Sequence, residues 1–195
     1  MAFKTFQPPT EWTPPDIFPT QQILDAEEIA IDTETRDPNL KEKGPGYVRG
    51  DGEIVGISIA VDGYADYFPF AHESGFNFPK KRVLEFMKDI LSGEQDKIFH
   101  NAMYDVGWLK KEGVDVKGRV IDTMVVAPLI NENMYWYTLN SLGMEYLQEG
   151  KSEAELRQAA EEWGIDPKAE MWRLPSSYVG TYATQDAALT LKLWN

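Results

Sequence analysis

The residues best suited to chemistry are four carboxylates from three separate parts of the chain: Asp32, Glu34, Asp105 and Asp186. Because the chain has no cysteine and only two histidines, a metal held by these residues must be a hard ion that prefers oxygen, such as Mg²⁺ or Mn²⁺. Four carboxylates at one point would repel one another, and two divalent ions would remove that repulsion. The residue types therefore predict a two-metal site for phosphoryl transfer.

The first two carboxylates lie at the carboxyl end of the apolar run 28–32, which is predicted to be a strand. On an extended chain, residues two apart point to the same side, so Asp32 and Glu34 would face one point. Ligands of open α/β sheets bind at this end of the strands. The same Asp-x-Glu pattern also begins at Asp25 and Asp51. Taken alone, the motif is more simply interpreted as a polar strand end followed by a turn.

The other two carboxylates are predicted to lie on helices. Asp105 falls in the first turn of a helix whose expected N-cap is Asn101, near the positive end of the helix dipole. Tyr182 and Asp186 are four residues apart in the final helix, so they share one face. The alternatives are an acid that only stabilises its own helix, and a tyrosine hydroxyl bonded to an aspartate inside a packed helix.

An α/β arrangement must position these side chains. Hydrophobic patterning predicts strands over residues 28–32, 54–61, 64–70, 97–100 and 119–121. It predicts helices over residues 79–93, 101–111, 122–130, 138–147, 152–163 and 178–194. The pair Asp62-Gly63 is a hairpin signal that makes two of the strands antiparallel. The prediction is a mixed five-stranded sheet with one antiparallel hairpin, flanked by helices.

Two further segments differ in composition from this pattern. Residues 1–20 hold five of the twelve prolines and are predicted to form an N-terminal arm, which leaves residues 21–195 as the folded domain. Residues 36–53 are rich in glycine, proline and charge, and are predicted to form a long loop beside the first motif.

Taken together, the three motifs resemble those of the DnaQ-like, ribonuclease H-like 3′–5′ exonucleases. Residues 32–35 resemble the first exonuclease motif, 101–105 the second and 182–186 the third. Residues 122–124 resemble the segment after the fifth strand of that fold. The similarity covers about residues 22–195 and is nearest to the proofreading domain of phage-type family A DNA polymerases. It implies a ribonuclease H-like α/β fold.

The third motif resembles the tyrosine subclass of this family. Tyr182 stands four residues before Asp186, whereas the histidine subclass places its histidine where this chain has Thr181. A tyrosine has an ordinary pKa of about 10. The resemblance therefore implies that Tyr182 orients the attacking water as a neutral group rather than acting as a strong base.

The resemblance also implies how the carboxylates divide their work. Asp32, Glu34 and Asp186 would hold one divalent ion, which activates the attacking water. Asp32 and Asp105 would hold a second ion beside the leaving 3′ oxygen. On the substrate side, with weaker correspondence to the family, the resemblance implies contacts from Thr33, Asn101 and Tyr104.

The implied activity is metal-dependent hydrolysis of phosphodiester bonds at the 3′ end of single-stranded DNA, which releases nucleoside 5′-monophosphates. The resemblance further implies proofreading for a DNA polymerase domain that is covalently linked or associated. Two alternatives stay open. One is a free-standing or RNA-trimming exonuclease of the same superfamily, and the other is a non-catalytic ribonuclease H-like binding module.

The charge of the chain limits how it can bind nucleic acid. With 19 basic and 32 acidic residues, the formal net charge is −13, which argues against a basic nucleic-acid-binding surface. Two divalent ions at the four carboxylates would reduce that charge to −9 and make the site able to accept a phosphate. The chain has no signal-like segment and no long apolar run, so we expect a cytoplasmic protein (in the host if it is viral) with no membrane partner.

Overall fold

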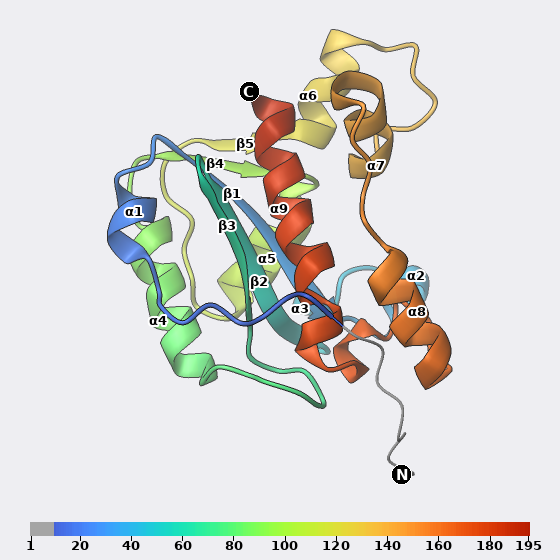
Figure 1. Ribbon diagram of the computed structural model, residues 1–195. Helices are drawn as coiled ribbons and strands as arrows, with labels where there is room; N and C mark the ends of the chain where they lie inside the picture. The colour runs from blue at the N-terminus through green and yellow to red at the C-terminus, as the bar shows by residue number, and fades with distance from the viewer. Residues whose placement is uncertain (1–9) are drawn as a thin grey trace.

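The computed structural model describes residues 10–195 and is built around a mixed sheet of five strands (Figure 1). The strands are β1 (Glu28–Arg36), β2 (Glu53–Val61), β3 (Tyr64–Pro69), β4 (Asp96–Phe99) and β5 (Val120–Asp122), in the spatial order β3-β2-β1-β4-β5. β1 and β2 pair antiparallel, as do β2 and β3, whereas β4 is parallel to both β1 and β5. Gly63 takes a φ of 72° in the turn between β2 and β3, so the predicted hairpin and α/β class are confirmed.

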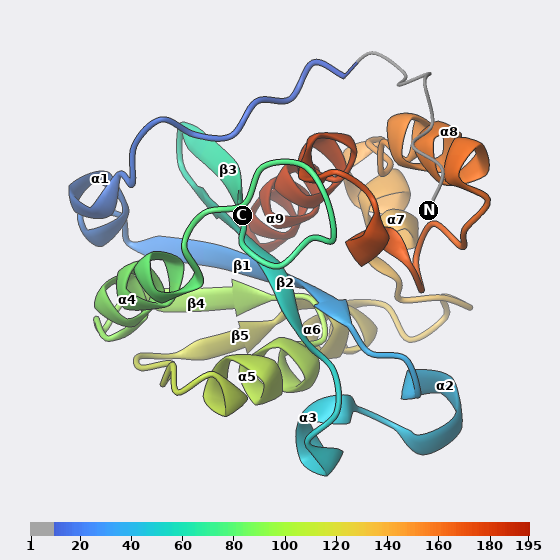
Figure 2. The same ribbon diagram turned by 90° about the horizontal axis from the view of Figure 1, so that it is seen from below.

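Helices cover both faces of this sheet (Figure 2). The longer α-helices are α1 (Thr20–Leu24), α4 (Lys80–Leu91), α5 (Ala102–Lys111), α6 (Thr123–Ile130), α8 (Ala154–Trp163) and α9 (Gly180–Trp194). Shorter helical segments are α2 (Leu40–Lys43), α3 (Gly46–Arg49), α7 (Leu139–Leu142), the π-helix Gly143–Leu147 and the 3₁₀ turns Met171–Arg173 and Ser176–Tyr178. No helix of residues 10–195 is both long and apolar enough to cross a membrane.

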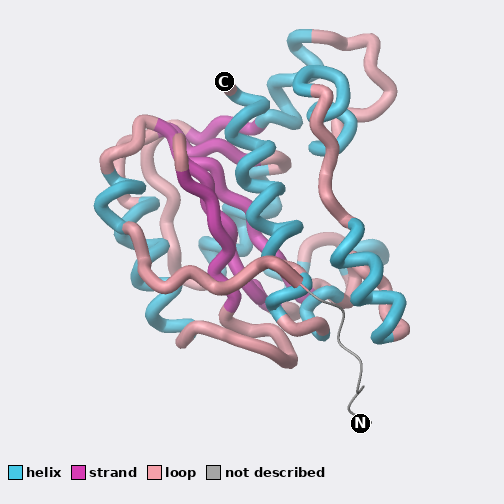
Figure 3. The backbone as a smooth tube through the Cα atoms, viewed as in Figure 1, coloured by secondary structure: helices cyan, strands magenta, loops and turns pink. Residues whose placement is uncertain are grey.

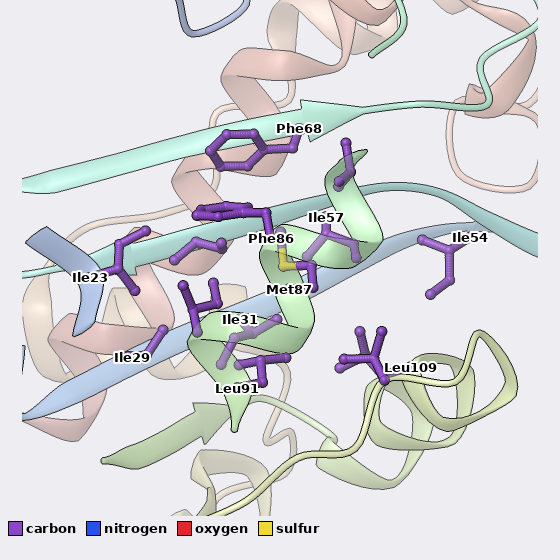
Figure 4. Close-up of a cluster of buried hydrophobic side chains, with 14 of the residues drawn as sticks. Ile23, Ile29, Ile31, Ile54, Ile57, Phe68, Phe86, Met87, Leu91 and Leu109 are labelled. Atoms are coloured by element: carbon purple, nitrogen blue, oxygen red, sulfur yellow. The ribbon is translucent and has the colours of Figure 1, made fainter. Parts of the chain in front are cut away.

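One face of the sheet carries the larger part of the core. Ile29 and Ile31 of β1 pack there with Phe86 and Met87 of α4 and with Leu109 of α5 (Figure 4). Since side chains alternate along a strand, these two isoleucines leave the residue between them to the other face. The helix that the sequence predicts over residues 79–93 is therefore present as α4, and its apolar side is buried in this core.

The opposite face is covered by α9, which contacts β1, β2, β3 and β4. Here the sheet presents small side chains. Ala30 and Ala60 are paired across β1 and β2, and both pack in one buried cluster with Ala187 of α9. Because alanine side chains are short, the backbone of α9 lies close to that of β1. This approach brings Asp186, the residue before Ala187, to the end of β1 that carries the first motif.

The first strand is longer than the sequence pattern predicts. The prediction ended it at residue 32, but β1 continues to Arg36 because Thr33 to Arg36 pair antiparallel with β2. A β-bulge interrupts this ladder between Glu34 and Thr35. Asp32 and Glu34 thus lie within the strand rather than in a turn after it. The loop expected over residues 36–53 holds the two short helices α2 and α3.

The helix predicted over residues 138–147 is not a uniform α-helix. It divides into α7 and the π-helix Gly143–Leu147. Gly143 lies at this junction, where an added Cβ would come within 2.4 Å of the carbonyl oxygen of Glu149. The close approach of the backbone explains why the chain uses glycine there. The helix predicted over 178–194 likewise begins as a 3₁₀ turn before α9 starts at Gly180.

Two aromatic side chains attach the segment before α1 to the domain. Residues 10–19 run as a loop from the start of α9 to α1 (Figure 3). The indole Nε1 of Trp12 donates to Asp66 at 3.2 Å, and its ring lies against Gly180. The ring of Phe18 meets that of Phe86 at 4.9 Å. Residues 1–9 of the predicted arm lie outside the described residues, and the boundary at residue 20 stays a prediction.

Candidate active site

The four carboxylates gather beside one cleft of about 460 Å³. Asp32, Glu34 and Asp186 each offer an oxygen, and these three atoms lie within 4.8 Å of one another. Asp105 of α5 also lines the cleft, and its charge acts on Asp32. The structure therefore brings together residues from β1, α5 and α9 that are up to 154 positions apart in the sequence.

Asp105 is fixed by the first motif itself. Its Oδ1 atom accepts a hydrogen bond from the backbone N–H of Thr33 at 2.9 Å and another from the Thr33 hydroxyl at 2.6 Å. Thr33 points to the side of β1 opposite to Asp32 and Glu34, which are its neighbours in the strand. The threonine expected to touch substrate is therefore only 7% exposed and is bound to Asp105.

Burial makes the ionised cluster electrostatically unfavourable. Burial together with the charge of Asp186 raises the pKa of Glu34 to about 8, and burial raises the pKa of Asp105 to about 7. The pKa of Asp32 also lies well above its ordinary value because of burial and of the charges on Glu34 and Asp105. A cation among these oxygens would favour their ionised forms.

The donor set fits a divalent ion. Two buried oxygens that face this region, Glu34 Oε1 and Asp186 Oδ1, have no hydrogen-bond partner within residues 10–195. Buried polar atoms are normally satisfied, so these two carboxylate oxygens are the atoms of the cluster best placed to accept a cation. All the ligand atoms are carboxylate oxygens, the type that hard ions prefer.

Tyr182 lies one helical turn before Asp186 on α9 and is 7% exposed. Its hydroxyl is hydrogen-bonded to Asp186 and accepts a hydrogen bond from Nζ of Lys151 at 3.3 Å. Burial and the nearby negative charges of Glu34 and Asp186 raise the pKa of Tyr182 far above its usual range. The phenol is therefore neutral.

Lys151 is a residue that the sequence analysis missed. Its ammonium pairs with Asp186 Oδ2, and its side chain is 14% exposed. Burial alone would lower the pKa of Lys151, but the charges of Asp186 and Asp32 outweigh it and raise the pKa. The residue stands in a loop before α8, where no spacing pattern distinguishes it from the other basic residues of the chain.

The remaining residues expected on the substrate side line the same cleft. Tyr104 lines it, and its hydroxyl is hydrogen-bonded to Thr35 at 2.8 Å and to Asp37 at 3.1 Å. Asn101 has a left-handed backbone with a φ of 76°. It occupies the N-cap position of α5, but its side chain makes no capping hydrogen bond, so the expected capping role is wrong.

The cap of α5 comes instead from Asp122, at the end of β5. Its Oδ2 accepts from the N–H of Ala102 at 2.7 Å, and its Oδ1 accepts from the N–H groups of Asn101 and Met124, each at 2.9 Å. One carboxylate thus accepts a hydrogen bond from the first turn of each of α5 and α6, and a third from the N-cap residue Asn101. This arrangement links the helix that carries Asp105 to the edge of the sheet.

Replacing Asp122 by alanine should destabilise the protein by about 2–4 kcal/mol, because three hydrogen bonds to a charged acceptor are lost together. Urea denaturation followed by circular dichroism measures the change. Asp122→Asn keeps one acceptor oxygen and should cost less than half as much. A loss below about 0.5 kcal/mol for Asp122→Ala would show that water replaces the cap.

A family profile for 3′–5′ exonucleases of family A DNA polymerases matches residues 20–195. The chain belongs to this exonuclease family. The expected enzyme class and the resemblance are therefore confirmed. A DNA-directed DNA polymerase of Pseudomonas phage M6 is 38% identical over 192 residues, which cover 94% of this chain and 28% of that protein. The exonuclease domain thus spans about a quarter of the length of this relative.

Solved structures of nucleases share the fold. RNase D of Trypanosoma brucei superposes with a TM-score of 0.64 at 21% identity, covering 89% of this chain and 58% of that one. NrnC of Brucella melitensis with bound Mg²⁺ gives a TM-score of 0.60 at 21% identity, covering 90% and 74%. These similarities confirm the ribonuclease H-like architecture of the exonuclease domain.

Proposed function

We propose that this exonuclease domain removes nucleotides one at a time from the 3′ end of single-stranded DNA and releases nucleoside 5′-monophosphates. The observation that carries the proposal is the buried carboxylate cluster with two unpartnered oxygens at the floor of an open cleft. The similarity to a phage DNA-directed DNA polymerase supports DNA as the substrate, proofreading for a linked or associated polymerase domain, and action in the cytoplasm of a bacterial host.

Mg²⁺ or Mn²⁺ is the proposed cofactor. Asp32, Glu34 and Asp186 would hold one ion, and Asp32 with Asp105 would hold a second. Bound in pairs, such ions activate a water nucleophile and neutralise the charge that develops on the phosphate. The burial of Glu34 and Asp186, which are 7% and 2% exposed, supports this use because it excludes competing water from the ligand oxygens.

The side chains around the cluster would orient the reactants. The neutral hydroxyl of Tyr182 donates to Asp186 and accepts from Lys151, so its remaining lone pair would accept a hydrogen bond from the attacking water. Thr33 keeps Asp105 in place through two hydrogen bonds. Tyr104, Asn101 and Leu139 also line the cleft and would contact the terminal nucleotide.

Single-stranded DNA and RNA of the same sequence, each labelled at the 5′ end, test the proposal. With Mg²⁺ or Mn²⁺, the wild-type domain should shorten the DNA from its 3′ end, whereas Asp32→Ala and a chelator-treated sample should leave it intact. Faster shortening of the RNA would favour the RNA-trimming alternative. Equal ladders from wild type and Asp32→Ala would indicate a contaminating nuclease and overturn the proposal.

A further inference from the structure

The loop that carries Lys151 is attached to α9 next to Asp186. Gln185, the neighbour of Asp186, accepts a hydrogen bond from the backbone N–H of Ser152 and donates one to the carbonyl oxygen of Gly150 at 3.0 Å. The N–H of Lys151 itself donates to Asn140 at 2.9 Å. Three backbone groups in a row are thus fixed, so the lysine side chain enters the cleft from a defined position.

Inside the cleft, the ammonium of Lys151 is held by two groups of α9. It donates to Asp186 Oδ2 and to the hydroxyl of Tyr182, and it lies 5.1 Å from the centre of the Tyr182 ring. These contacts bury the side chain to 14% exposure, which is unusual for a lysine. They leave Asp186 Oδ1 as the oxygen without a partner.

The two oxygens of Asp186 therefore differ: one is paired with Lys151, and the other is free to bind an ion. Oδ2 faces a lysine, and Oδ1 is one of the oxygens proposed to bind a divalent ion. An ion on Oδ1 and the ammonium of Lys151 on Oδ2 would be separated only by the Asp186 carboxylate. Because both are positively charged, they would repel each other. The charge of Lys151 also acts on Asp32 and Glu34, the other proposed ligands of that ion.

A second lysine at the cleft does not share this position. Lys168 lines the cleft, but its ammonium pairs with Glu153 at 2.9 Å and its side chain is 57% exposed. The charge of Lys168 also acts on Glu34 and Asp186, but water and the partner carboxylate weaken its effect. Lys151 is therefore the cation of residues 10–195 that is buried in direct contact with a proposed metal ligand.

We infer that Lys151 is a positioning residue that sets the metal affinity of the site: it presents Asp186 Oδ1 to the ion and, through its charge, weakens the binding of that ion. The inference rests on the proposed metal-dependent function. When all groups are ionised, the lysine leaves three net negative charges where the carboxylates alone would give four. The site then binds divalent ions less tightly than its ligands allow.

Titration of metal-free protein with Mn²⁺, followed by the electron paramagnetic resonance signal of the free ion, tests this directly at a pH of about 8, where the cluster can ionise. Lys151→Gln removes the charge and keeps an N–H donor for Asp186, and Lys151→Met removes both. Both variants should bind Mn²⁺ about tenfold more tightly than wild type, because one nearby like charge is gone. Lys151→Arg keeps the charge and should stay within about twofold of wild type.

Lys192→Met provides the matched control. Lys192 is on the same helix as Asp186 and also pairs with a carboxylate, that of Glu149 at 2.7 Å, but neither residue lines the cleft. Its replacement should leave Mn²⁺ binding unchanged. Melting of the metal-free proteins gives a second measurement. Lys151→Gln should melt at a lower temperature than wild type without metal and gain more from added Mn²⁺, since tighter binding stabilises the folded state more.

The results separate this inference from the proposed function. Unchanged or weaker Mn²⁺ binding by Lys151→Gln, with wild-type binding that depends on Asp32, overturns the inference and leaves the metal site standing. Mn²⁺ binding that is equally absent from wild type and Asp32→Asn overturns the proposed function. If Lys151→Met fails to melt cooperatively, Lys151→Gln decides the question, because it retains the hydrogen bond.

Discussion

Replacing Asp32 by asparagine should slow removal of the 3′ nucleotide by more than about 10³-fold, beyond the 10–100-fold expected for an outer partner of a metal ligand. Asp32 is the carboxylate proposed to bind both ions. One of its oxygens lies within 4.8 Å of an oxygen of Glu34 and of one of Asp186. Asparagine has nearly the same shape, so the packing of β1 is kept while the negative charge is lost. Initial rates on 5′-labelled single-stranded DNA with saturating Mg²⁺ measure the effect.

Asp25→Asn is the matched control for this experiment. Asp25 begins another Asp-x-Glu pattern, but it is an exposed residue after α1 whose carboxylate is bound by Gln21 at 2.7 Å. The control should keep the wild-type rate within about twofold, as surface substitutions usually do. If Asp32→Asn retained more than about a tenth of the wild-type rate, the proposed role of this residue in holding both ions would be wrong.

Without metal, the protein should lose stability as the pH rises from about 4.5 to about 8, and Glu34→Gln should remove a large part of that loss. The folded-state pKa of Glu34 is raised from 4.5 to about 8, so the folded protein binds a proton that the unfolded chain releases across this interval. The unfolded state therefore binds fewer protons there, and the free energy of unfolding falls as the pH increases. Near pH 8, metal-free Glu34→Gln should exceed wild type in stability by roughly 2 kcal/mol.

Urea denaturation of both proteins at two pH values in the presence of a chelator measures this difference. The difference between wild type and Glu34→Gln is informative because it cancels the effect of the high net charge of the rest of the chain. Glu27→Gln, in the exposed Asp25 pattern, should change stability by less than about 0.5 kcal/mol at either pH. A Glu34→Gln variant that is less stable than wild type at both pH values would contradict the strained state of the cluster.

Added Mn²⁺ should make the wild type more stable than Glu34→Gln, the reverse of the metal-free result. The ion stabilises the ionised carboxylates of the wild type, whereas Glu34→Gln has lost one ligand and gains less. Stability at high pH is thus expected to depend on metal in wild type.

The parts of the fold that were predictable from sequence are those whose signals are local. The Asp62-Gly63 turn lies directly between two apolar strands, and the apolar stripe of residues 80–91 has helical spacing. The end of β1 was missed because Thr33, Glu34 and Arg36 are polar, and only pairing with β2 keeps them extended. The capping role of Asp122 was missed because its signal is also not local. It accepts from N–H groups at the start of α5, about 20 residues earlier in the chain.

The candidate site divides in the same way. Alternation along a strand brings Asp32 and Glu34 together, and helical spacing places Tyr182 beside Asp186, so these pairs follow from the sequence. Lys151 does not follow from it. Its position depends on Gln185 binding two backbone groups of a loop that is more than 30 residues earlier, a contact without a sequence pattern.

The alanines between β1 and α9 have a consequence for coordination chemistry. Asp32 and Glu34 come from the strand and Asp186 from the helix, so the span of the chelate is set by the distance between two backbones. Ala30, Ala60 and Ala187 fix that distance by their small volume. If the site holds a divalent ion as proposed, side chains that never touch the ion would therefore help to set which ionic radius the site accepts.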